Sequence, residues 1–129
     1  MKRSLVDANV LLRLILRDDE RLFAMAYQII NKALPNSLVV TLVTAGEVLY
    51  VLGPKDYNRK QSVDALMLLI DRPQFKQSEL LSNSLRLYSE TKLDYADCYL
   101  LVRALSKGEK IKTLDGQLLK TYNLLKKPT

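Results

Sequence analysis

Four acidic side chains occupy positions where a carboxylate is unusual. Asp7 is the only charged residue in the run SLVDANVLL, and Glu47 is the only one in LVTAGEVLYVL. Asp97 heads a helical stripe of apolar residues, and Asp115 directly follows the segment KIKTL. A buried carboxylate costs several kcal/mol unless it is paired or binds a cation. These four acids are therefore our candidates for chemistry.

Each candidate also has an ordinary alternative. Asp7 has the form of a turn aspartate, Glu47 that of a partly exposed glutamate at the edge of an apolar stripe, and Asp115 that of a helix N-cap. Asp94 stands three residues before Asp97, the spacing of a capping box, which explains Asp94 better than it explains Asp97. Together, the four acids indicate a shared site more strongly than any one of them does alone.

The residue types that are absent narrow the chemistry to a hard metal ion. The chain has no histidine, which removes the usual general base and imidazole metal sites. Its one cysteine, Cys98, lacks partners for a zinc site and is expected to be buried and inert, and its four glycines form no phosphate-binding loop. Converging carboxylates would instead select Mg²⁺ or Mn²⁺. Such an ion activates water and stabilises charge at phosphorus.

The elements expected to position these acids alternate between strands and helices. The patterns predict strands at 3–6, 38–41 and 110–114, a short extended piece after Pro73, and helices at 10–17, 21–34, 42–52, 58–70, 79–90, 94–107 and from 115 onward. Alternation of this kind predicts a three-layer α/β/α sandwich with a central parallel sheet of four to five strands. Ligands bind at the carboxyl ends of such strands, where all four acids would meet.

Length and charge describe one basic globular domain. The 129 residues suit a single domain covering 1–129, with 48% hydrophobic and 26% charged residues. No apolar run approaches the roughly 20 residues that span a membrane, and the N-terminus lacks the apolar core of a signal peptide, so we expect a cytoplasmic protein. A net charge of +6 favours a polyanionic partner such as nucleic acid.

The runs LVDANVLLRLILRDD, GEVLYVL, LDYADCYLL and KTLDGQLL resemble, in this order and spacing, the PIN-domain ribonucleases, in particular VapC-like toxins of VapBC toxin–antitoxin modules. The resemblance implies that the acids Asp7, Glu47, Asp97 and Asp115 are catalytic and bind Mg²⁺ or Mn²⁺. It also implies that three polar residues help to order the site: Asn9, Thr113 and Asp94.

The resemblance further implies an endoribonuclease that hydrolyses RNA phosphodiester bonds, a homodimer and a VapB-like antitoxin. Apolar residues in the helices after Asp18 and before Pro54 exceed what a small domain easily buries, which indicates either a protein interface or simply the core. The alternative function is a noncatalytic basic domain that binds RNA or forms a complex. A phosphorylation receiver domain is disfavoured, because adjacent acids after the first strand and a lysine after the last are missing.

Overall fold

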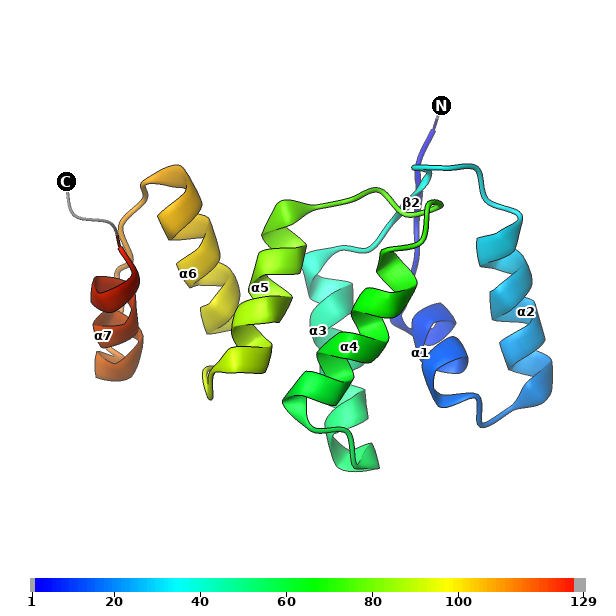
Figure 1. Cartoon of the computed structure of the whole chain (residues 1–129), viewed down its shortest axis with the longest axis horizontal. Coiled ribbons are helices and arrows are strands. Elements are labelled where there is room, and N and C mark those ends of the chain that lie inside the picture. Colours follow the sequence, from blue (N-terminus) through cyan, green and yellow to red (C-terminus); the bar gives the residue numbers. More distant parts are fainter. Residues whose placement is uncertain (1, 127–129) are drawn as a thin grey trace. The chain divides into compact units, whose positions relative to one another are not determined.

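The computed structural model describes residues 2–126 and divides into two compact units, Met1–Ser78 and Glu79–Thr129. The first unit contains β1 (Ser4–Leu5), α1 (Ala8–Leu16), α2 (Glu20–Asn31), β2 (Leu38–Val39), α3 (Leu42–Leu52), a 3₁₀ turn (Gly53–Lys55) and α4 (Arg59–Ile70). The second contains α5 (Glu79–Glu90), α6 (Tyr95–Lys107) and α7 (Gly116–Leu125), as labelled in Figure 1.

The first unit is a helical body around a small parallel sheet. β1 pairs with β2 in the register Ser4 to Leu38 and Leu5 to Val39, and the backbone N–H of Val6 donates to the carbonyl of Val39 at 3.0 Å. Leu38 also forms a parallel bridge to Phe75, which confirms the extended piece expected after Pro73. Helix α1 packs against α2, α3 and α4, and the fully buried side chains include Leu11, Ile30, Leu52 and Leu66.

The predicted sheet of four to five strands is not confirmed. The described residues contain two paired strands, each two residues long, and no strand at 110–114. The segment Lys110–Leu114 has the alternating pattern of a strand, but it lies in a unit whose described residues offer no strand edge to pair with. A strand exists only through its ladder, so alternation alone does not make one.

The second unit is built from three helices around a compact core. Helix α5 packs against α6, and α6 against α7, around the buried residues Leu93, Cys98, Leu101 and Leu118. Gly108 ends α6 in the left-handed conformation with φ of 66°, and the next N–H, of Glu109, donates to the carbonyl of Ala104 at 2.9 Å. The buried position of Cys98 confirms its expected burial.

The helix predictions agree closely with the structure. Helices α3 and α5 have the predicted bounds, and the other helices differ by a few residues at most. Helix α4 begins after Asn58, whose side chain accepts from the N–H of Gln61 at 2.8 Å while the Gln61 side chain accepts from the N–H of Asn58. Within residues 2–126, no helix has both the length and the apolar character needed to cross a membrane.

Candidate functional site

Asp7 stands at the junction between β1 and α1. Its carboxylate caps α1 by accepting from the backbone N–H of Val10 at 3.1 Å, so the turn role considered from the sequence is real. The side chain is exposed, as is Asn9 in the first turn of the helix. Both residues line a groove of about 370 Å³ whose other walls are Arg13 and apolar side chains of α1 and α2: Val10, Leu22, Met25, Ala26 and Ile29.

Glu47 lies on an exposed face of α3. It forms no hydrogen bond or ion pair with any residue in 2–126. Its neighbours one turn away on the same face, Val43 and Tyr50, are 73% and 83% exposed. The exposed side chain agrees with the alternative interpretation of Glu47 as a partly exposed glutamate at the edge of the apolar stripe.

Asp97 is the electrostatically perturbed acid of the second unit. It lies in the first turn of α6 and is partly buried. Burial raises the pKa of Asp97, and the negative charges of Asp94 and Asp115 raise this pKa further. The second unit therefore brings three of the predicted acids within electrostatic reach of one another.

Asp115 and Thr113 form a local hydrogen-bonded turn before α7. The Asp115 carboxylate accepts from the N–H groups of Gln117 at 2.9 Å and Leu118 at 3.2 Å, which makes Asp115 the N-cap of α7. The Thr113 hydroxyl accepts from the N–H of Asp115 at 2.9 Å. Thr113 thus fixes the backbone that carries the Asp115 carboxylate.

Asp94 corrects one prediction. It occupies the N-cap position of α6 with extended backbone angles, but its side chain makes no capping hydrogen bond, so the capping box with Asp97 is absent. Its carboxylate is exposed and acts on Asp97 through charge instead. An acid at this spacing can serve as either a cap or a charged neighbour, and only the rotamer decides between them.

Each unit by itself holds two of the four candidate acids. Asp7 and Glu47 belong to the first unit, and Asp97 and Asp115 belong to the second. In neither unit do the described residues place three or more acidic or cysteine side chains close enough to hold a metal ion. The donor set itself fits a hard divalent cation, since all four groups are carboxylates and repulsion among the acids already perturbs Asp97.

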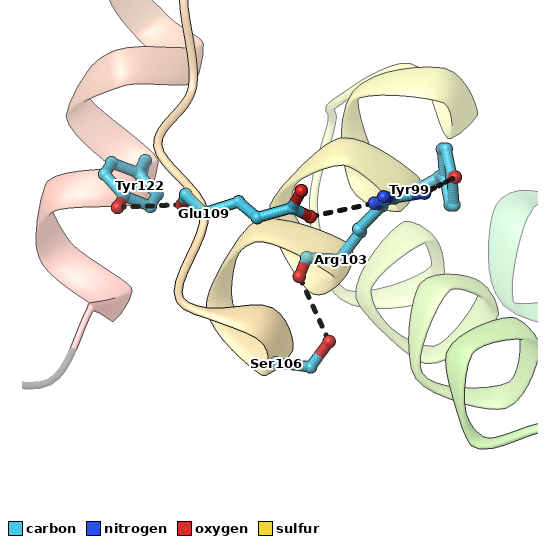
Figure 2. A network of polar contacts seen from close by, with 5 residues as sticks. All are labelled: Tyr99, Arg103, Ser106, Glu109 and Tyr122. Atoms are coloured by element: carbon cyan, nitrogen blue, oxygen red, sulfur yellow. Dashed lines mark hydrogen bonds and ion pairs between the residues drawn. The ribbon is translucent and has the colours of Figure 1, made fainter.

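The second unit contains a polar network that the sequence did not predict. The Arg103 Nε donates to the Glu109 carboxylate at 2.9 Å, and the Nη1 of the same arginine donates to the Tyr99 hydroxyl at 3.4 Å, as Figure 2 shows. The Tyr122 hydroxyl donates to the Glu109 carbonyl at 3.3 Å. Tyr99 and Arg103 have the helical spacing of four residues, but no periodic signal links Arg103 to Glu109, because that pair forms across the left-handed turn at Gly108.

Comparison with known proteins assigns the chain to a family. The family model of the PIN domain matches residues 4–124, nearly the whole chain, and the chain therefore belongs to the PIN-domain family. Searches of curated proteins and of solved structures found no match. PIN domains are α/β domains that generally act on nucleic acids as nucleases and usually bind divalent metal ions.

Proposed function

We propose that this protein is a metal-dependent endoribonuclease that hydrolyses RNA phosphodiester bonds, and that it is the toxin of a type II toxin–antitoxin pair. One observation carries the proposal: the PIN match runs through residues 4–124 and includes all four isolated acids. The net charge of +6 supports a polyanionic substrate. If the four acids bind the metal ion, the rest of the chain carries a still larger positive charge.

The proposed centre uses Asp7, Glu47, Asp97 and Asp115 to hold Mg²⁺ or Mn²⁺. It requires both units to act as parts of one domain, so that acids of both units bind the same ion. The family match supports this requirement, because its range, residues 4–124, includes both sides of the boundary at Ser78. The Leu38–Phe75 bridge supports a sheet that extends beyond β1 and β2.

The acids of the second unit are suited to receive a cation. Partial burial, and after it the two neighbouring carboxylates, raise the pKa of Asp97 and so disfavour its negative charge, and a divalent ion would relieve that cost. The cap hydrogen bonds hold the Asp115 carboxylate, and the Thr113 hydroxyl holds its backbone N–H, so the carboxylate has a fixed position relative to α7. When bound, the ion supplies water activation and stabilisation of charge on the phosphate oxygens.

The proposed protein partners are an antitoxin of the VapB kind and a second copy of the chain. Large apolar side chains on α2 and α3 are exposed, including Met25 at 52% and Ile29 at 51%. Both line the groove beside Asp7, so an apolar segment bound there would also cover a proposed metal ligand.

Cleavage of a mixed cellular RNA pool tests the enzymatic proposal. The purified protein is incubated with Mn²⁺, with Mg²⁺ and with chelator, and the Asp97→Asn variant serves as the control for contaminating nucleases. We expect discrete products that require both the metal and Asp97. Products that persist with Asp97→Asn would refute the site assignment.

A noncatalytic RNA-binding or complex-forming PIN domain is the second candidate. The observation in its favour is that, among residues 2–126, neither unit places three acids close enough to hold one metal ion. This candidate predicts no cleavage and no thermal stabilisation by Mn²⁺, because caps and ion pairs do not respond to the ion. Together, those two negative results would replace the nuclease proposal.

A further inference from the structure

A basic pocket lies on the second unit, outside the four acids. It has a volume of about 220 Å³ and is lined by the charged residues Arg103, Glu109, Lys110 and Lys112 and by apolar side chains of α6 and the following segment. Three cations against one carboxylate give the pocket an excess of positive charge. From Arg103 onward the sequence has seven lysines and arginines against two acids, so the excess extends around the pocket.

The guanidinium of Arg103 is held in place rather than free to swing. Glu109 and the Tyr99 hydroxyl fix two sides of it, and Tyr122 fixes the backbone of Glu109 (Figure 2). Arg103 lowers the pKa of Glu109, which keeps that carboxylate ionised and paired with the guanidinium at neutral pH. Glu109 is therefore a positioning residue whose charge is already compensated.

Several donors remain for a ligand. Arg103 has five N–H groups, and the described contacts use Nε and one on Nη1. Lys110 and Lys112 are exposed and form no ion pair with any residue between 2 and 126. A planar guanidinium beside two ammonium groups is a donor set that suits the oxygens of a phosphodiester.

The pocket adjoins a second hollow of the same unit. A second hollow of about 460 Å³ shares Ile111 and Lys112 with it and is also lined by Thr113 and Leu114. Leu114 is fully exposed and immediately precedes Asp115. The two hollows thus adjoin at Ile111 and Lys112 and follow the segment between α6 and α7, which offers an apolar side chain for a base or ribose and cations for the backbone.

We propose that this basic pocket, formed by Arg103, Lys110 and Lys112, binds a phosphodiester of the RNA strand that leads to Asp97 and Asp115. The proposal rests on the proposed ribonuclease function and adds a substrate-binding site to it. Arg103 lies six residues after Asp97 on α6, about 9 Å along the helix axis, so the pocket is separate from the acids.

Binding of a fluorescein-labelled oligouridine, followed by anisotropy in excess EDTA, tests the proposal without any catalysis. The test variant is Lys110→Gln/Lys112→Gln. The matched control is Lys107→Gln/Lys120→Gln, which removes the same charge from exposed positions of the same unit outside both hollows. We expect the test variant to bind about tenfold more weakly and the control to stay within about twofold of the original chain.

The salt dependence gives a second readout. Loss of a direct phosphate contact flattens the plot of log K against log salt by about 0.7 per contact for a single strand, so the test variant should show a smaller slope and the control an unchanged one. Equal weakening by both variants would overturn the pocket and indicate general charge attraction. Absence of RNA binding by the original chain in EDTA would overturn it as well.

An acidic protein segment is the competing occupant. Selective loss of polyglutamate binding in the test variant, with oligouridine binding retained, would assign the pocket to such a segment and overturn the RNA proposal. Metal-dependent cleavage with Asp97→Asn as control tests the ribonuclease function separately. The pocket and the enzyme can therefore fail independently.

Discussion

At the scale of single residues, the candidate acids have structural roles that do not compete with binding. Asp7 and Asp115 each use a carboxylate oxygen to cap a helix, and this leaves further lone pairs on both groups for a ligand. A capped carboxylate also has a fixed orientation, which is an advantage in a metal ligand. The alternatives raised from the sequence are thus compatible with the proposed site.

The Asp97→Asn variant should be slightly more stable than the original chain at neutral pH without metal. Folding raises the pKa of Asp97 above its ordinary value of 3.8, so the native state is most favoured when this acid is protonated and loses stability as pH rises through the raised pKa. The amide removes that loss, a gain of about 0.5 kcal/mol at this partly solvated position. Urea unfolding at neutral pH and below pH 3.8 measures the difference, which should vanish in acid. Destabilisation at neutral pH would contradict clustered acids.

Thr113→Val should destabilise the turn before α7, because the N–H of Asp115 loses its acceptor while the side-chain volume is kept. The expected cost is about 1 kcal/mol in urea unfolding. Thr113→Ser retains the hydroxyl and should recover most of the stability. If the two variants were equally stable, the hydrogen bond would have no measurable role.

At the scale of elements, the end of α6 sets the position of the Arg103 network. The left-handed Gly108 turns the chain so that Glu109 returns toward Arg103 across six residues. No atom lies within 4 Å of a Cβ built at Gly108, so the constraint there is the backbone conformation and not crowding.

Gly108→Ala should cost about 1 kcal/mol in thermal or urea unfolding, since a Cβ disfavours positive φ. Gly108→Asn is the matched variant, because asparagine tolerates this conformation and should lose less. Equal effects of alanine and asparagine would indicate that φ is not the cause.

At the scale of the whole molecule, a metal centre that uses acids of both units should stabilise the entire chain. With Mn²⁺ at about 100 times its Kd, the expected gain is about 2.7 kcal/mol, seen as a rise in Tm that chelator reverses. Asp97→Asn should abolish the rise. A rise that is unchanged in this variant would place the bound ion elsewhere.

The sequence predicted the helices well because their information is local. Apolar spacing, the Asn58 cap and Gly108 mark the ends of helices that the structure confirms. The larger sheet predicted from the sequence is not confirmed. The segment 110–114 becomes a strand only if the edge of another strand accepts its hydrogen bonds. The Arg103–Glu109 pair was missed for a similar reason, because a turn conformation and not a period brings the two together.

The complete burial of Cys98 turns the only thiol of the protein into a reporter for opening of the second unit. A thiol reagent can react only when the core around Leu101 and Leu118 opens, so the labelling rate gives the free energy of that opening. We expect this free energy to equal that of the main unfolding transition followed by circular dichroism, as one cooperative domain requires. Faster labelling would mean that the second unit opens while the first unit stays native. The two pairs of proposed metal ligands would then leave their folded positions in two separate transitions.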